Sequence, residues 1–227
     1  MNVTERIGRA LVIAPHPDDE VLGCGGTIAR LAASGREVHV GIATEGRPPL
    51  YTAESVMRVR AEADAAHRLL GVVKTHFLTL PAAGLDTIPQ TDINQALQQL
   101  IADVGPDTLF VPFAGDIHVD HQLIFAAAMV AVRPLGKDYP RRVFAFETLS
   151  ETNWGAPGVK PRFDPSLFID IDETLDRKLA AFCLYASQVK PFPHERSVEA
   201  ISALARLRGA TVHLSAAEAF VMVREVG

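Results

Sequence analysis

The sequence predicts an α/β fold: a Rossmann-like three-layer arrangement in which helices cover both faces of a mainly parallel, twisted sheet. Two observations predict it. Short apolar runs rich in β-branched residues alternate with longer amphipathic stretches over residues 1–150, the pattern of a doubly wound sheet. The chain of 227 residues, of which 48% are hydrophobic and 22% charged, is also long and apolar enough to bury a core.

The predicted strands are short apolar runs, and the predicted helices have apolar residues at helical spacing. The run at residues 10–14 is apolar throughout, as expected for a strand that is buried on both faces. Three helical stretches end at Gly35, Gly71 and Gly105, and glycine commonly terminates helices. In chain order the expected elements are strand 10–14, helix 25–34, strand 37–43, helix 54–70, strand 74–80, helix 92–104, strand 107–112, helix 119–132 and strand 143–147.

The pattern changes after residue 150. Residues 150–165 are rich in proline and glycine, which predicts a loop. Beyond it we expect a strand at 167–171, helices at 174–187 and 197–207 (the latter stopped by Gly209), and a strand at 219–223. No flexible linker precedes this part. Residues 151–227 are therefore expected to elaborate the core of residues 1–150 within a single domain, 1–227.

Composition narrows the function classes. With a net charge of −5, the chain lacks the basic surface that nucleic acids or anionic membranes attract. The longest apolar stretch near the start, 10–15, is far shorter than the roughly 20 residues of a membrane span, and no secretion signal stands before it. We therefore expect a cytoplasmic protein that binds neither nucleic acid nor membrane, with Cys24 and Cys183 reduced and buried.

Two clusters of polar residues follow two of the predicted strands. Residues 15–20 (Pro-His-Pro-Asp-Asp-Glu) come directly after the first strand, and residues 116–121 (Asp-Ile-His-Val-Asp-His) follow the fourth. In a sheet of order 3-2-1-4-5 these strands flank the point where the strand order reverses, and ligands bind there at the carboxyl ends. The sequence therefore predicts that both clusters line one crevice.

The residue types in these clusters suit a catalytic metal. Zinc in such sites takes three histidine or carboxylate ligands and keeps one position open, and His16, Asp19 and His121 form such a set. We expect one Zn²⁺ per chain, although the same donors also bind iron, cobalt or manganese. The alternative without a metal is a polar turn in which an aspartate caps the next helix.

Catalysis at such a metal needs further groups. Bound zinc lowers the pKa of its water and polarises a carbonyl, and Asp18 lies in the right loop to accept the proton of that water. His118 is placed to donate to the oxyanion. Asp120 would either hold the His118 ring in the required tautomer or support a metal ligand.

Five more residues are predicted to contact substrate. Glu45 and Glu147 end the second and fifth strands, and Arg60 lies on the second helix. His194 and Arg196 belong to a late loop that would fold over the mouth of the crevice. For each, an ordinary surface charge or ion pair is the competing interpretation. The glycines at 23, 25 and 26 fit no phosphate-binding spacing, so we expect them to allow close packing of a helix.

Together these motifs resemble the PIG-L/LmbE-like zinc deacetylases. Residues 14–26 are similar to the opening signature of that family, and residues 118–121 to its H-x-D-H motif. Tyr185 is a departure, because many members have histidine there, and Pro15 replaces an alanine. Weaker landmarks lie at 44–46, 60–72, 178–188, 193–197 and 208–220, so the resemblance spans nearly the whole chain.

The resemblance implies zinc on His16, Asp19 and His121, Asp18 as general base, and His118 near the oxyanion with support from Asp120. It also implies a hydrolase that removes acetate from a small N-acetylated amino sugar or its conjugate. Relatives often form homo-oligomers, so the resemblance leaves both a monomer and a homo-oligomer open.

Three other functions remain open. The same site could cleave a larger amide of a sugar or thiol-sugar conjugate. The chain could instead be a noncatalytic sugar- or nucleotide-binding domain, although that function does not require paired aspartates beside two histidines. A dinucleotide-dependent oxidoreductase is disfavoured because the G-x-G-x-x-G fingerprint is missing.

Overall fold

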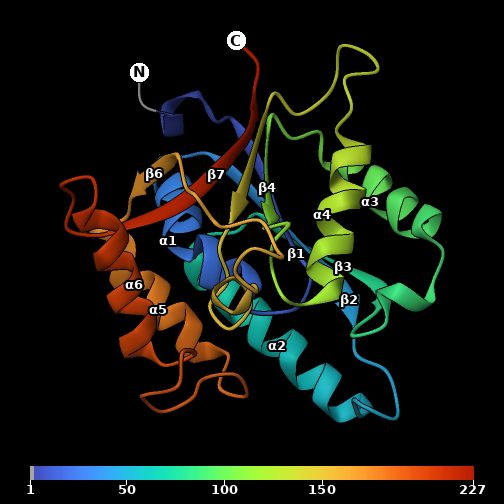
Figure 1. The fold of residues 1–227 in the computed structure, drawn as a ribbon, viewed down its shortest axis with the longest axis horizontal. Helices are drawn as coiled ribbons and strands as arrows, with labels where there is room; N and C mark the ends of the chain where they lie inside the picture. The colour runs from blue at the N-terminus through green and yellow to red at the C-terminus, as the bar shows by residue number, and fades with distance from the viewer. Residues whose placement is uncertain (1–2) are drawn as a thin grey trace.

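The computed structural model describes residues 3–227. Its seven strands form one sheet of order β3-β2-β1-β4-β5-β7-β6 (Figure 1). The strands from β3 to β5 are parallel, whereas β7 runs antiparallel to both β5 and β6. The predicted fold class and the order 3-2-1-4-5 are confirmed. The strand bounds are β1 Arg9–Ala14, β2 Glu37–Glu45, β3 Lys74–Pro81, β4 Thr108–Pro112, β5 Arg142–Phe146, β6 Leu167–Asp170 and β7 Ala217–Glu225.

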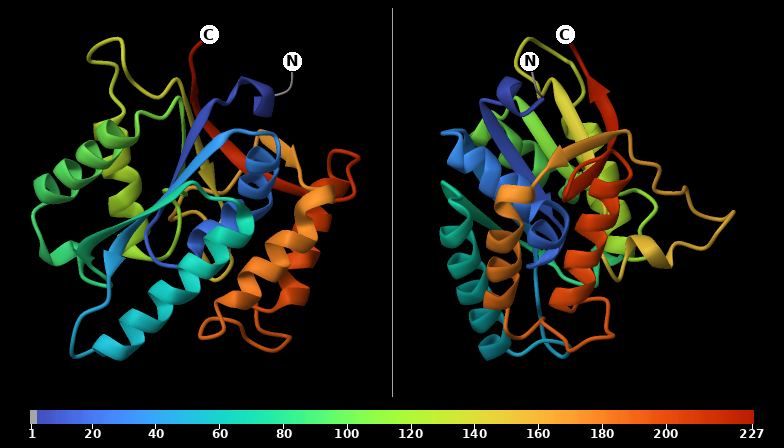
Figure 2. Two further views of the ribbon diagram at one scale, coloured as in Figure 1. Left: turned by 180° about the vertical axis from the view of Figure 1, so that it is seen from behind. Right: turned by 90° about the vertical axis from the view of Figure 1, so that its left-hand side faces the viewer.

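Helices cover both faces of the sheet (Figures 1 and 2). The alternating side chains of β1 belong to two separate cores: Leu11 and Ile13 pack with α3 and α4, whereas Val12 packs with α1, α2, α5 and α6. The helix bounds are α1 Asp19–Ala33, α2 Ala53–Leu70, α3 Gln90–Val104, α4 Val119–Ala131, α5 Leu175–Leu184 and α6 Val198–Ala210, with short 3₁₀ helices η1 Val3–Arg6, η2 Leu85–Thr87, η3 Thr152–Trp154 and η4 Asp172–Thr174.

Two predicted helix bounds are wrong, the start of α1 and the end of α6, whereas the close packing expected of the glycines at 23 and 26 is present. Helix α1 begins at Asp19, not at residue 25, so three glycines lie inside it. A Cβ on Gly23 would lie 2.3 Å from the Phe146 ring, and one on Gly26 would lie 2.8 Å from Ile171. Helix α6 likewise continues past Gly209, whose Cβ would meet the Leu214 carbonyl at 2.7 Å. These glycines let a helix approach its neighbours closely.

A buried ion pair is inserted into the side of α1. The Lys178 ammonium lies 2.6 Å from the Glu218 carboxylate, and both residues are buried. Lys178 donates to the carbonyl of Leu22 at 2.8 Å, while Glu218 accepts from the backbone N–H groups of Gly26 and Thr27 at 2.9 and 2.7 Å. In an uninterrupted α-helix the Gly26 N–H pairs with the Leu22 carbonyl. Side chains from α5 and β7 thus form hydrogen bonds with backbone groups of α1 that would otherwise pair within the helix.

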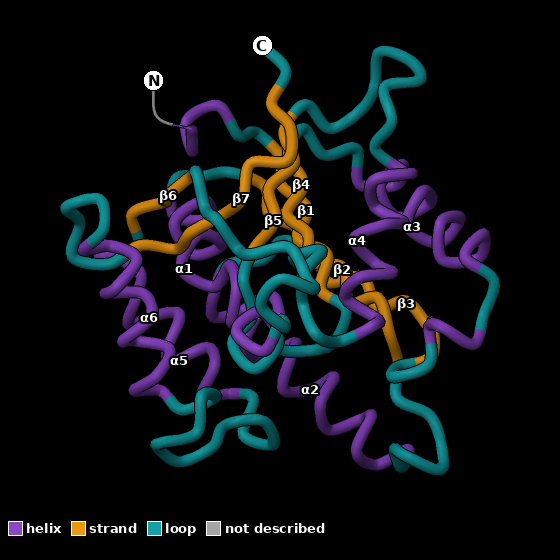
Figure 3. The backbone as a smooth tube through the Cα atoms, in the orientation of Figure 1, coloured by secondary structure: helices purple, strands orange, loops and turns teal. Residues whose placement is uncertain are grey.

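The remaining differences are local. The segment between β5 and β6, teal in Figure 3, is loop-like as predicted and contains η3. Cys183 is exposed, contrary to expectation, whereas Cys24 is buried; both thiols are free. Among residues 3–227, none of the helices has the length and apolar character needed to cross a bilayer.

Replacement of Gly23 by alanine is expected to lower the free energy of unfolding by roughly 1–3 kcal/mol, because the new methyl group overlaps the Phe146 ring. Urea denaturation measures this loss. Gly136 is the matched control, because a Cβ there meets nothing within 4 Å. Equal stability of Gly23→Ala and Gly136→Ala would mean that the contact with β5 does not require a glycine.

Candidate functional site

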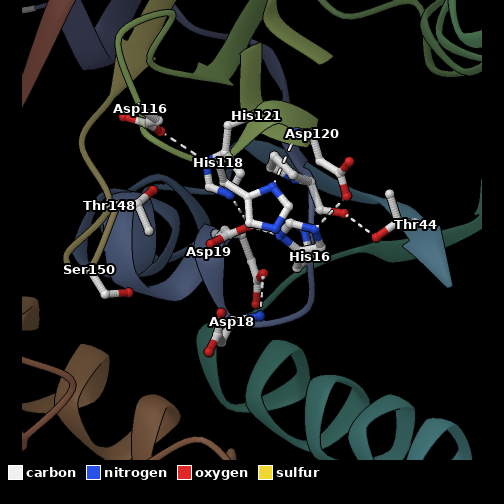
Figure 4. Close-up of polar contacts among 12 residues, drawn as sticks. His16, Asp18, Asp19, Thr44, Asp116, His118, Asp120, His121, Thr148 and Ser150 are labelled. Atoms are coloured by element: carbon white, nitrogen blue, oxygen red, sulfur yellow. Dashed lines mark hydrogen bonds and ion pairs between the residues drawn. The ribbon is translucent and has the colours of Figure 1, made fainter. Parts of the chain in front are cut away.

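Two histidines and an aspartate meet at the carboxyl ends of β1 and β4. His16 and Asp19 come from the β1–α1 connection, and His121 comes from the first turns of α4 (Figure 4). The Asp19 Oδ2 atom lies 3.4 Å from His16 Nδ1 and 3.3 Å from His121 Nε2. All three donor atoms lie within 4.8 Å of one another, which is close enough for one ion to contact them all.

Each histidine ring is oriented by a carboxylate on its far side. His16 Nε2 lies 2.9 Å from Asp120 Oδ2, and His121 Nδ1 lies 2.8 Å from Asp116 Oδ2. The other nitrogen of each ring therefore faces Asp19 (Figure 4). Metal-binding histidines commonly have such carboxylate partners, which fix the tautomer and the ring orientation.

The carboxylates of Asp120 and Asp116 are themselves fixed by hydrogen bonds. Asp120 accepts hydrogen bonds from the backbone N–H groups of Ala83 and Leu85, at 2.7 and 3.2 Å. Asp116 accepts one from the Thr152 hydroxyl at 2.6 Å. From its place after β4, five residues before His121, Asp116 was expected either to cap α4 or to orient a ligand, and its hydrogen bond to His121 is the orienting arrangement.

The donor set fits a divalent cation. Asp19 Oδ1 is buried and has no hydrogen-bond partner among the described residues, and the ionic neighbour of the buried His121 Nε2 is Asp19 itself, so an ion placed between them would contact both residues. Burial alone would lower the pKa of both histidines. Hydrogen bonds to Asp120 and Asp19 instead raise the pKa of His16 to about 9, and the Asp19 charge with the Asp116 hydrogen bond raises that of His121 to about 10. A bound cation would replace the protons that these rings otherwise carry.

Asp18 is buried beside this cluster in a strained backbone conformation. Its φ angle of 104° lies in the region that glycine prefers, which costs about 1–3 kcal/mol for another residue. Its Oδ2 atom accepts a hydrogen bond from Arg196 at 2.9 Å. Burial raises the pKa of Asp18 well above its usual value, and the Arg196 charge opposes this shift. A raised pKa is typical of a carboxylate that exchanges protons near neutral pH.

His118 is the N-cap residue of α4, and its ring lies beside that of His16 with centroids 4.6 Å apart. Its Nδ1 atom accepts from the backbone N–H of Asp120 at 3.1 Å. Burial, and then the charge of His16, lowers the pKa of His118, which favours the neutral ring. A neutral ring whose Nδ1 is an acceptor carries its proton on Nε2 and can donate from there. Of the two roles predicted for Asp120, the structure matches the second: its carboxylate pairs with the metal-ligand candidate His16 and not with the His118 ring.

A cavity of about 370 Å³ opens onto this cluster. Three of the five residues predicted to contact substrate line it: Glu45, Arg60 and Arg196. Glu45 and Arg60 form an ion pair at 2.9 Å, and the Arg60 guanidinium lies 5.0 Å from the centre of the Phe77 ring. Other lining residues that the sequence did not single out include Glu151, Ser187 and Gln188.

Glu147 and His194, which were also expected to contact substrate, do not line this cavity. Glu147 forms two hydrogen bonds with Arg208, at 2.8 and 2.6 Å, beside a second cavity of about 360 Å³. His194 is exposed, and its Nδ1 atom accepts from the backbone N–H of Arg196 at 3.0 Å. His194 therefore shapes the loop that carries Arg196, and Glu147 is held by α6.

Comparisons with known proteins agree with this geometry. Residues 11–132 match the sequence model of the family described as GlcNAc-PI de-N-acetylase, PIG-L. The 2'-N-acetylparomamine deacetylase of Streptomyces fradiae is 32% identical over 155 residues, which are 58% of this chain and 54% of that protein, so the match spans about half of that relative. The diacetylchitobiose deacetylase of Thermococcus kodakarensis is 28% identical over 83% of this chain and 72% of that protein. A solved structure of a conserved protein from Thermus thermophilus has a TM-score of 0.77 and 30% identity, covering 96% of both chains.

Proposed function

The chain belongs to the PIG-L family, described as GlcNAc-PI de-N-acetylase, and on that premise we propose that it is a metal-dependent hydrolase that removes the acetyl group from an N-acetylated amino sugar or its conjugate. The relatives named above are deacetylases of different acetylated sugars. The observation that carries the proposal is the convergence of His16, Asp19 and His121 beside Asp18, next to a cavity that His16 and Asp18 line.

His16, Asp19 and His121 would hold the metal, and Asp120 and Asp116 would keep the two imidazole rings aimed at it. When bound, Zn²⁺ polarises an amide carbonyl and makes water more acidic. Asp19 is suited to this position because its pKa lies well below the usual value: burial by itself would raise it, but the charge and hydrogen bond of His121 lower it. The carboxylate is thus ionised whenever a cation can bind.

Asp18 and His118 then carry the proton and charge transfers of the reaction. Asp18 accepts a proton from water as the water oxygen adds to the amide carbon. His118 donates from Nε2 to the carbonyl oxygen as that oxygen becomes negative. Asp18 returns the proton to the nitrogen as the carbon–nitrogen bond breaks, which yields acetate and a free amine. Arg196, hydrogen-bonded to Asp18 Oδ2, keeps this carboxylate at the cavity wall throughout.

The lining of the cavity also provides groups for binding the sugar. Glu45, Arg60 and Arg196 present charged hydrogen-bonding groups to its interior, and a sugar has hydroxyls that such groups bind. We assign these three residues to substrate binding. The cavity volume of about 370 Å³ is in the range of small-molecule sites, which favours a small amino-sugar substrate.

Zinc-dependent release of a free amine from N-acetylated sugars is the expected result of the first experiment. Metal-stripped protein is incubated with a panel of N-acetylated amino sugars, their conjugates and bulkier amides, before and after addition of one equivalent of Zn²⁺. Amine release appears only with metal because the reaction depends on the carbonyl polarisation and acidified water that metal supplies.

Two results would contradict the proposal. Release from bulkier amides alone would move the activity to a different bond at the same site. No bound zinc and no release from any compound would remove the hydrolase interpretation and favour a sugar- or nucleotide-binding domain. The Asp18→Asn variant is the negative control for contaminating activity.

A further inference from the structure

Glu20 lies behind the site, fully buried, and its carboxylate accepts from three elements. Its Oε2 atom accepts from the backbone N–H of Asp18 at 3.1 Å. Its Oε1 atom pairs with the Tyr185 hydroxyl after α5 at 2.5 Å and with His67 Nε2 on α2 at 3.0 Å. Tyr185 and His67 do not line the cavity of about 370 Å³, and the hydrogen bond from this network to a residue that does is the one between Glu20 and Asp18.

The network contacts a residue whose backbone conformation is strained. Asp18 has a φ of 104°, and such conformations persist only where the surroundings fix them. Arg196 fixes the side chain of Asp18, and the backbone N–H groups of Val21 and Leu22 fix its carbonyl. The remaining backbone group, the N–H of Asp18, is fixed by Glu20. The direction in which the Asp18 carboxylate leaves the backbone therefore depends on where Glu20 lies.

We propose that Glu20 and Tyr185 are positioning residues that hold Asp18 in its reactive orientation. The inference rests on the proposed function, in which the Asp18 carboxylate moves the proton. Tyr185 fixes the position of Glu20 because, among the described residues, its hydroxyl donates to Glu20 and to no competing acceptor. Burial raises the pKa of Tyr185 well above the usual value, so the hydroxyl keeps its proton and donates.

His67 completes the support from the other side. Its Nδ1 atom lies 2.7 Å from the Thr75 hydroxyl on β3, so the ring spans from the sheet to Glu20. With His67 and Tyr185 on opposite elements, Glu20 Oε1 is held between α2 and the end of α5. Loss of one donor leaves a buried carboxylate with a weaker anchor, and it can then shift along with the Asp18 N–H.

The Tyr185→Phe variant tests the proposal, because it removes the hydroxyl and keeps the ring that packs in the core. We expect kcat to fall about tenfold, since small displacements of a catalytic group have effects of this order, and KM and bound zinc to stay within about twofold of the wild-type values. Tyr139→Phe is the matched control: Tyr139 lies far from the site, with its ring near Arg224, and its variant should have wild-type kcat.

Two further measurements separate positioning from general destabilisation. Adding Tyr185→Phe to Glu20→Gln should lower kcat by less than about twofold more, because both changes act on one network. A crystal structure of Tyr185→Phe should show the φ of residue 18 moved from 104° or the carboxylate turned away from Arg196.

The outcomes are distinguishable from failure of the proposed function. If wild-type protein releases no amine, the hydrolase proposal fails, and the crystal structure of Tyr185→Phe still decides the inference. If the wild type is active, an unchanged kcat in Tyr185→Phe, multiplicative effects in the double variant, or an unmoved Asp18 overturns the inference.

Discussion

The Asp18→Asn variant should lose turnover by a factor of about 10² to 10⁴, the contribution typical of a positioned general base, and should keep its metal. An amide cannot accept the proton from water, yet it has nearly the same shape as the carboxylate. Asparagine also tolerates positive φ better than most residues, so the φ of 104° at this position should not lower the free energy of unfolding of the variant further. The measurements are amine release and bound zinc per chain.

Asp138→Asn is the matched control, because Asp138 is exposed in the loop before β5. It should retain wild-type activity. Loss of zinc together with activity in Asp18→Asn would reassign Asp18 as a metal ligand, and wild-type turnover would remove it from the mechanism.

The His121→Ala variant should lose both metal and activity, because it removes one of three ligand side chains. It also leaves the Asp116 carboxylate without its imidazole partner in a fully buried position, so the free energy of unfolding should fall as well. Bound zinc, measured after dialysis against metal-free buffer, is the primary readout.

Two further variants provide an intermediate case and a negative control for His121→Ala. Asp116→Asn keeps the ligand and weakens only its orientation, so zinc affinity should fall about 10–100-fold without being abolished. His76→Ala removes a histidine of β3 that pairs with His39 away from the cluster, and zinc content should not change. A full equivalent of zinc in His121→Ala would mean that the metal lies elsewhere, with His16, His118 and Asp120 as the other described cluster able to hold it.

The sequence predicted the central strands and the convergence of His16 and His121, since both depend on simple rules. Buried parallel strands are continuous apolar runs, and residues at their carboxyl ends meet at one edge of the sheet. Asp19 followed from the same rule. The order of the central strands then placed two segments about 100 residues apart in sequence beside each other.

The sequence-based predictions fail where contacts between residues far apart in the sequence determine the structure. The start of α1 was placed too late because glycine has a low helix propensity, and the sequence does not reveal that Phe146 and Ile171 are the neighbours against which these glycines pack. Glu147 directly follows β5, but its carboxylate pairs with Arg208, 61 residues away in the sequence. The insertion of β7 between β5 and β6 has no local signal, because a strand's own residues do not state which neighbour it pairs with.

The ion pair between Lys178 and Glu218 has a consequence for the order of events during synthesis. Helix α1, which begins at Asp19 of the cluster, emerges from the ribosome before α5 and β7. The side chains that form hydrogen bonds with the backbone of Leu22, Gly26 and Thr27 belong to those later elements. Lys178 is made 156 residues after Leu22, and Glu218 is made 192 residues after Gly26. During synthesis β1 and β2 are therefore complete before α1 has these two partners, and α1 gains the second of them only when β7 joins the sheet.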